Sequence, residues 1–341
     1  MNSSFLRQAS LVAVLLLACA LPQASGDENS LRAFFENARN QADVKAKGQP
    51  GFVLRGDVRV HIKKDATSDG KFLFVWSPDG KWKEELVFTG YKRTRIGNGQ
   101  QFWQTRSTES ESPLVFELGK VMTVSRAPKV AETDRFKLET KANAGNIPTE
   151  CIKREIEKRP GATYCFDAET GDLLSVSAEK DSSEVPWQTR RRVFSDFQDF
   201  AGKRLPRTLL AFNGKQVVIE LRLEDIKPLP VIPSDFFVPP TDATEWGDCP
   251  DGEAWKLKDR TTPAYPSSAR AQHHQGTVTL YATIEDDGRP SKLQVFQSAG
   301  ADLDESAIAT VRQWRYERTS ACSTSKGRNE TIVDVIYSLS P

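Results

Sequence analysis

The sequence has few of the groups on which enzymes depend. It contains three histidines, His61, His273 and His274, and no Ser-His-Asp, His-Glu-x-x-His or glycine-rich phosphate-binding pattern accompanies them. His61 alternates with apolar neighbours and should face away from the core, while His273 and His274 should end a short helix. We therefore predict no catalytic residue, no cofactor and no metal site. A hydrolase is the least favoured function.

The chain also lacks an excess of charge of either sign. It has 47 lysines and arginines against 46 aspartates and glutamates, a formal net charge of +1. Binding to nucleic acid or to an anionic membrane is therefore not indicated. The one dense basic run, Arg190-Arg191-Arg192, is better explained as the solvated end of a strand.

A long hydrophobic segment is absent, but a short one follows the N-terminus. Residues 1–26 combine Arg7, the apolar run 11–20 and the small residues Ala24-Ser25-Gly26, which together predict a secretory signal peptide. The expected location is the periplasm. The alternative is a lipoprotein that is anchored through Cys19, because the residues before Cys19 approximate a lipobox.

Four cysteines remain after the signal segment, an even number that suits an oxidising compartment. Cys151 and Cys165 flank Arg159-Pro160-Gly161, so we predict a hairpin closed by a disulfide. The remaining pair, Cys249 and Cys322, would form a second bridge. A metal site is the alternative, but the spacings are not Cys-x-x-Cys.

Residues 27–240 predict one helix followed by a long antiparallel sheet. Ser30 is the expected N-cap of the helix, whose apolar face carries Leu31, Phe34, Phe35 and Ala38. Alternating apolar runs then follow, separated by the turn patterns Asp69-Gly70, Pro78-Asp79-Gly80, Gly97-Asn98-Gly99, Glu169-Thr170-Gly171 and Asn213-Gly214. We expect a curved sheet, a half-barrel, with the helix packed on its concave side.

Aromatic residues recur at the period of strands in this region. The candidates for lining a cavity are Phe72, Phe74, Trp76, Phe88 and Trp103, together with Phe102 and Phe116. Such a cavity could hold lipid acyl chains. The alternative is that these rings simply fill the core.

Three segments carry a resemblance to the LolA-like family of periplasmic carriers: the leading helix, the stretch from Phe194-Ser195-Asp196-Phe197 to Arg204-Leu205-Pro206, and the closing Asp235-Phe236-Phe237-Val238-Pro239. This resemblance implies the outer-membrane lipoprotein-sorting fold. It also implies the alternative function of the chain, a periplasmic carrier of lipid or lipoprotein.

Residues 241–261 break the periodicity and predict a linker, and residues 262–341 predict a small α+β domain. In chain order, the expected elements are a helix over 267–272, a strand from Gly276, a turn at Asp287-Gly288, a return strand from Leu293, a helix that starts at the capping pair Asp302 and Glu305 and ends at Trp314-Arg315-Tyr316, and a last strand over 331–340.

The ordered series of Pro263-Ala264-Tyr265-Pro266, Gly276-Thr277-Val278, Asp287-Gly288-Arg289, Leu303-Asp304 and Trp314-Arg315-Tyr316 resembles the C-terminal domain of TonB. The resemblance implies a β-α-β domain that grips an outer-membrane or envelope protein. It departs from the family at Arg318, where a proline is usual, and in the polar loop 319–330.

The last strand is the predicted partner-binding element. Its inward side chains should be Val333, Val335, Tyr337 and Leu339, and its outer edge should accept a strand of the partner. The expected contact residues are Thr331, Val333, Asp334, Val335 and Tyr337.

Overall fold

The fold is known from a computed structural model. It describes residues 27–63, 66–98, 101–108, 127–139, 143–144, 147–157, 159–178, 191–233, 235–245, 255–319 and 329–339, with Val115 and Leu118. The predicted signal segment, Cys19, Phe116, Arg190, Cys249 and Cys322 lie outside these residues. No helix in the described ranges is long and apolar enough to cross a membrane.

The helices with full bounds in the described residues are α1 (Glu28–Gln41), α3 (Ser267–Ala271) and α4 (Ala301–Val311), and Val115 and Leu118 are also helical. The strands are β1 (Phe52–Lys63), β2 (Ala66–Trp76), β3 (Trp82–Phe88), β4 (Tyr91–Gly97), β5 (Phe102–Arg106), β6 (Arg135–Leu138), β7 (Asn143–Ala144), β8 (Ile147–Ile156), β9 (Arg159–Asp167), β10 (Leu173–Ala178), β11 (Arg191–Phe200), β12 (Lys203–Asn213), β13 (Gln216–Leu223), β14 (Lys227–Pro228), β15 (Thr244–Glu245), β16 (Trp255–Asp259), β17 (Gly276–Ile284), β18 (Pro290–Gln297), β19 (Arg315–Arg318) and β20 (Glu330–Tyr337).

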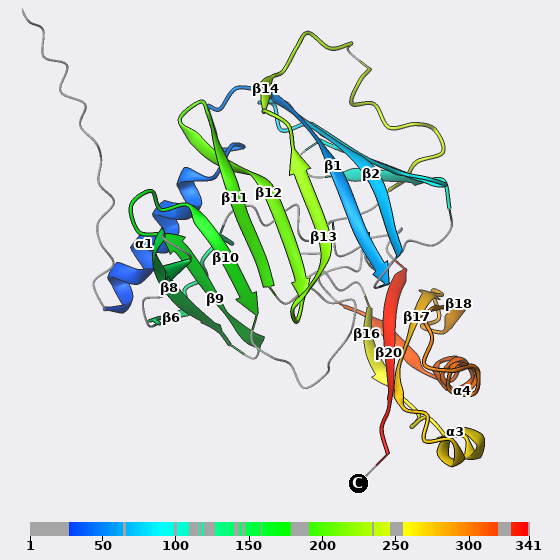
Figure 1. Ribbon diagram of the computed structural model, residues 1–341. Coiled ribbons are helices and arrows are strands. Elements are labelled where there is room, and N and C mark those ends of the chain that lie inside the picture. Colours follow the sequence, from blue (N-terminus) through cyan, green and yellow to red (C-terminus); the bar gives the residue numbers. More distant parts are fainter. Residues whose placement is uncertain are drawn as a thin grey trace, which may run out of the picture.

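The N-terminal region is one antiparallel sheet that bends along its length, as predicted (Figure 1). Its main path runs β15-β5-β4-β3-β2-β1-β13-β12-β11-β10-β9-β8-β6, with β14 beside β1 and β7 beside β8. Neighbours in this path are mostly neighbours in sequence, because short turns connect antiparallel strands. The core is a single cluster that joins α1 to the sheet.

Helix α1 buries the apolar face that the sequence predicts. Leu31, Phe34, Phe35 and Ala38 are all buried. The predicted N-cap is wrong by three residues: the Asp27 carboxylate caps the helix by accepting a hydrogen bond from the backbone N–H of Ser30 at 3.0 Å. A carboxylate at this end is also favoured by the helix dipole.

Asp69-Gly70 does not form the predicted turn. Both residues lie within β2, where Gly70 stands opposite Val58 on one side and Phe88 on the other. A Cβ at Gly70 would lie 2.6 Å from the Phe88 ring. The glycine therefore makes room for an aromatic ring in the sheet.

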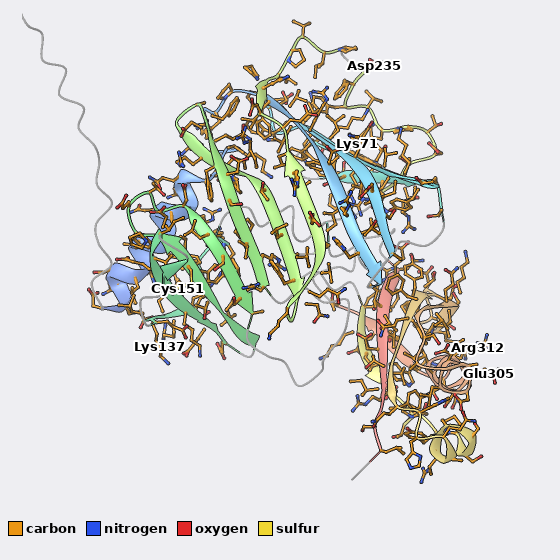
Figure 2. The ribbon with its side chains drawn as sticks, viewed as in Figure 1. Lys71, Lys137, Cys151, Asp235, Glu305 and Arg312 are labelled. Atoms are coloured by element: carbon orange, nitrogen blue, oxygen red, sulfur yellow. A yellow bond between two sulfur atoms is a disulfide. The ribbon has the colours of Figure 1, made fainter. Side chains whose placement is uncertain are left out.

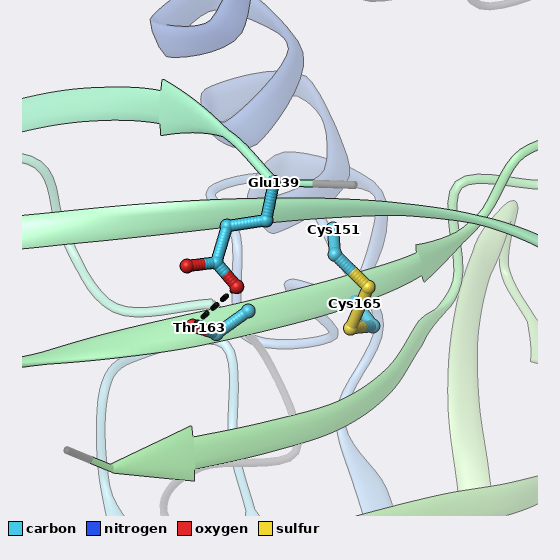
Figure 3. Close-up of a disulfide and its surroundings, with 4 residues drawn as sticks. All are labelled: Glu139, Cys151, Thr163 and Cys165. Carbon is cyan, nitrogen blue, oxygen red and sulfur yellow. Dashed lines mark hydrogen bonds between the residues drawn. A yellow bond between two sulfur atoms is a disulfide. The ribbon is translucent and has the colours of Figure 1, made fainter. Parts of the chain in front are cut away.

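A disulfide joins Cys151 to Cys165, as predicted. The two cysteines are directly opposite each other on β8 and β9, next to the hydrogen bond from Thr163 to Glu139 (Figure 3). The bridge therefore closes a hairpin that the strand ladder already holds.

The C-terminal region has its own small sheet, in the order β18-β17-β20, and its own core. Leu303, Ala307 and Val311 of α4 are fully buried and belong to the same core as Val333 and Val335 of β20. The turn at Asp287-Gly288 between β17 and β18 is confirmed, since Gly288 has a φ of 80° there.

The ends of α4 differ from the prediction. Its N-cap is Gly300, and Asp302 instead accepts a hydrogen bond from Ser268 of α3 at 2.9 Å. Glu305 is exposed on the outer side of α4 and so does not close a capping box (Figure 2). The box fails because glycine at the N-cap has no side chain to take part in it.

Trp314-Arg315-Tyr316 does not end the helix. α4 stops at Val311, and Arg315–Arg318 forms β19, which pairs with β16 from the predicted linker segment. Trp314 does lie in the core, and its indole N–H donates to the Thr261 carbonyl at 3.1 Å. Residues just before the C-terminal domain thus complete its packing.

Candidate partner-binding edge

The edges of the two main sheets differ in length and regularity. The N-terminal sheet ends at β15, which has two residues, and at β6, which has four. The C-terminal sheet ends at β18 and β20, which have eight residues each. Short edge strands give an incoming strand little to pair with, so the C-terminal sheet offers the longer templates.

β20 is the regular edge of the C-terminal sheet. It pairs with β17 over eight consecutive residue pairs, from Gly276 opposite Tyr337 to Thr283 opposite Glu330, without a register shift. The pairing of β18 with β17 shifts twice, and Lys292 within it has a φ of 45°. Since bulges twist an edge away from pairing, β20 is the better template. In the described residues β17 is its single strand partner.

The two faces of β20 follow the predicted alternation. Val333, Val335 and Tyr337 are buried against the C-terminal core, whereas Ile336 on the opposite face is 52% exposed. The strand ends at Tyr337, so the predicted inward residue Leu339 lies beyond it. Thr331 stands opposite Ala282 at the start of the strand.

Asp334 is the polar residue in the middle of β20. Its carboxylate accepts a hydrogen bond at 2.7 Å from the hydroxyl of Thr279, directly opposite on β17. Thr279 is fully buried, so this bond satisfies a polar group that would otherwise be costly. The cross-strand bond holds β20 to β17 from the face that also carries Ile336.

The first residue of β20 contacts the N-terminal sheet. Arg106 at the end of β5 donates two hydrogen bonds to the Glu330 carboxylate, one of them from Nη1 to Oε2 at 2.8 Å. The side chains are 15% and 21% exposed. A polar pocket of about 210 Å³ opens beside them, lined by Arg106, Tyr281, Thr283, Lys292, Gln294, Asn329 and Glu330.

The electrostatics of this contact favour the ion pair. Burial disfavours the charged guanidinium, but the hydrogen bonds and the attraction of Glu330 outweigh it and raise the pKa of Arg106. Burial, followed by the negative charge of Glu330, raises the pKa of Tyr281, so its phenol stays neutral. The Arg106 guanidinium therefore remains charged over the whole physiological pH range.

The predicted cavity-lining aromatics do not share one environment. Phe72, Trp76 and Phe88 are buried in the N-terminal core, while Phe74 and Trp103 are half-buried. Phe74 belongs to a chain of ring contacts that crosses the sheet, from Phe52 through Phe74 and Trp82 to Phe102. Among the described residues, no cluster of His, Cys, Asp or Glu could hold a metal ion.

The Arg106–Glu330 contact is not part of the sequence-based prediction. It joins residues 224 positions apart, and neither stands in a recognisable motif. The alternation that predicts β20 identifies its buried face but gives no information on what lies beside Glu330.

Residues 261–337 match the family of the Gram-negative bacterial TonB protein C-terminal, which confirms the resemblance seen in the sequence. Protein TonB of Klebsiella pneumoniae is 33% identical over 60 residues. That alignment covers 17% of this chain and 25% of the Klebsiella protein, so the chain spans about a quarter of the length of this relative.

Two solved structures are similar to the N-terminal part. A LolA superfamily protein from Nitrosomonas europaea has a TM-score of 0.42 at 12% identity, covering 60% of this chain and 97% of that one. A domain assigned to outer membrane lipoprotein sorting, from Vibrio parahaemolyticus, has a TM-score of 0.43 at 10% identity, covering 62% and 97%. These TM-scores indicate that the folds are only loosely similar.

Proposed function

We propose that this chain is an exported cell-envelope protein whose C-terminal domain binds an outer-membrane or envelope protein. The partner adds a strand to the outer edge of β20. The observation that carries the proposal is the long, regular edge of β20 within the segment that matches the TonB C-terminal family. The proposal assigns no enzymatic activity, cofactor or nucleic acid to the chain.

In strand addition, backbone and side chains make different contributions to binding. Backbone hydrogen bonds to the added strand supply affinity, while alternate side chains supply specificity. Val333, Val335 and Tyr337 are already packed in the core. Ile336 is exposed and is therefore the side chain of β20 on which an apolar residue of the partner can pack.

Proline substitution tests the role of the backbone. Along a strand, successive N–H groups point to opposite edges, so Val335→Pro and Ile336→Pro remove donors from the two different edges of β20. The variant that loses an outward donor should keep its fold and lose binding to a peptide from the periplasmic segment of an outer-membrane receptor. The other variant loses a bond to β17 and should be less stable.

Asp334→Asn is the matched control, because the amide oxygen can still accept the bond from Thr279. It should keep binding close to that of the parent chain in a calorimetric titration. Circular dichroism identifies the proline variants that remain folded. If both proline variants are folded and bind as well as the parent, the partner does not pair with β20.

The alternative function is a carrier of lipid or lipoprotein acyl chains in the N-terminal sheet. The observation that favours it is the half-buried state of Phe74, Trp82 and Phe102 in the ring contacts across β2, β3 and β5. A carrier should show a shift in tryptophan emission when a long-chain amphiphile is added, and Trp103→Phe should reduce that shift. An unchanged spectrum at saturating amphiphile would leave only the packed core.

A further inference from the structure

The junction between the two domains lies on the proposed partner-binding strand. β20 starts beneath the N-terminal sheet and runs away from it to the C-terminus (Figure 1). Glu330 accepts hydrogen bonds from Arg106, and both Ile332 and Phe296 pack against the N-terminal core. Four residues after Ile332, Ile336 is 52% exposed. The start of β20 is therefore docked on the other domain, while the side chain of Ile336 near its end is exposed.

We infer that Arg106 is a positioning residue for partner binding, and that the N-terminal domain orders the β20 edge before a partner strand pairs with it. This inference rests on the proposed function of β20. It adds that both domains are needed for binding, because Arg106, which holds the first residue of β20, belongs to β5 of the N-terminal domain.

The geometry of the contact suits a positioning role. A bidentate pair between a guanidinium and a carboxylate fixes orientation as well as distance, which a single hydrogen bond does not. Arg106 donates to both carboxylate oxygens of Glu330, and Tyr281 of β17 lies beside the same pair. The contact thus holds β20 relative to both β5 and β17.

Fixing one end of an edge strand should matter for binding. An edge strand makes backbone hydrogen bonds to one neighbouring strand instead of two. The ends of such strands open most readily. If β20 is already ordered, less conformational entropy is lost when the partner binds than if binding must first order the strand. Loosening Glu330 should therefore weaken binding even though the partner pairs with residues further along the strand.

A double-mutant cycle on the full two-domain chain tests the inference. Hydrogen exchange of the β20 amides is measured without partner in the parent, Arg106→Ala, Glu330→Ala and the double variant. Each single variant should increase exchange at 331–336 by about tenfold, and the double variant should increase it no further. Arg59→Ala is the control, since Arg59 pairs with Asp69 at an exposed site within the N-terminal sheet.

Three outcomes of the exchange experiment would overturn the inference. The first is unchanged exchange at β20 in Arg106→Ala. The second is a uniform increase over β17, β18 and α4 as well, because that would report a general loss of stability instead of positioning. Additive effects of the two single changes would show that the side chains do not act as a pair, and would equally count against it.

A second measurement separates this inference from the proposed function. The receptor peptide should bind Arg106→Ala about tenfold more weakly than the parent, and Arg59→Ala should bind like the parent. If the proline variants show that the peptide does not use β20, the proposed function fails, while the exchange cycle still decides whether Arg106 orders the strand. If the cycle succeeds and peptide affinity is unchanged, Arg106 has no role in binding.

Discussion

The two main sheets of this protein end in different ways, and the difference indicates where a partner can bind. The large N-terminal sheet stops at strands of two and four residues, β15 and β6. In β6, Lys137 adds a charge at the edge, paired with Glu155. Short and charged edges discourage pairing with other chains. The three-stranded C-terminal sheet instead presents β20, with eight residues in unbroken register.

The cores of the two regions differ as well. The N-terminal core is large and has aromatic pairs where α1 meets the sheet, whereas the C-terminal core is smaller and combines residues of α3, α4, the three-stranded sheet and the β16–β19 pair. A small domain has little apolar surface to bury. The second face of the C-terminal sheet is partly buried by the N-terminal domain, against which Phe296 and Ile332 pack.

The largest expected effect is on the N-terminal core. Phe35 is fully buried and contacts the rings of Phe136, Tyr164 and Phe166. Phe35→Ala should destabilise the N-terminal domain by about 3 to 5 kcal/mol through lost burial and a cavity. Urea unfolding followed by circular dichroism measures this. Phe35→Leu, which refills most of the space, should cost clearly less, and equal costs would contradict a packed core at α1.

Loss of the disulfide should have the next largest effect. Replacing Cys151 and Cys165 by alanine should lower the free energy of unfolding by about 3 kcal/mol, because the open loop gains freedom in the unfolded state. The denaturation midpoint of the N-terminal domain gives the value. Adding reductant to this double variant then tests the predicted Cys249–Cys322 bridge. Any further loss of stability would indicate that this bridge is present. A midpoint equal to that of the parent would show that the bridge adds no stability.

A smaller effect is expected from Gly70→Ala. The new methyl group would meet the Phe88 ring at 2.6 Å, so the N-terminal domain should lose about 1 to 3 kcal/mol. Thermal unfolding gives the change in stability. Phe88→Ala in the Gly70→Ala background should cost less than the sum of the two single changes, because it removes the clash. Additive costs would mean that the two positions do not meet.

The smallest effect concerns pH and the C-terminal domain. Burial raises the pKa of Tyr316 from 10.0 to about 12, so the folded state disfavours the phenolate. The associated stability is fully present below pH 10 and is lost as the pH rises towards 12, by roughly 1 to 2 kcal/mol. Tyr316→Phe should flatten this part of the stability profile. A parent and variant with parallel profiles from pH 10 to 12 would contradict the burial of this phenol.

Sequence periodicity was sufficient for the elements that bury one face. The apolar residues of α1 and the inward residues Val333 and Val335 of β20 are where the alternation and helical spacing predict them, because burial of a repeating face depends only on local periodicity. Cys151 and Cys165 also pair as predicted, since the hairpin between them is a local structure.

Turns, caps and segment boundaries were less well determined by local patterns. Asp69-Gly70 has the composition of a turn, yet Gly70 lies inside β2 because the Phe88 ring needs its space. The run after α4 has the composition of a helix end, yet it forms β19 because β16 is available to pair with it. In both cases a residue distant in the sequence decides the local conformation.

The amino-acid sequence by itself determined the two regions, their β-rich character and the strand that carries the candidate edge. Only the tertiary structure decided that β20 pairs with β17 in unbroken register and that Arg106 of β5 bonds its first residue. The physical reason is the range of the interactions. Side-chain periodicity is a property of a few neighbouring residues, whereas strand order and the contact across 224 positions depend on how whole elements pack.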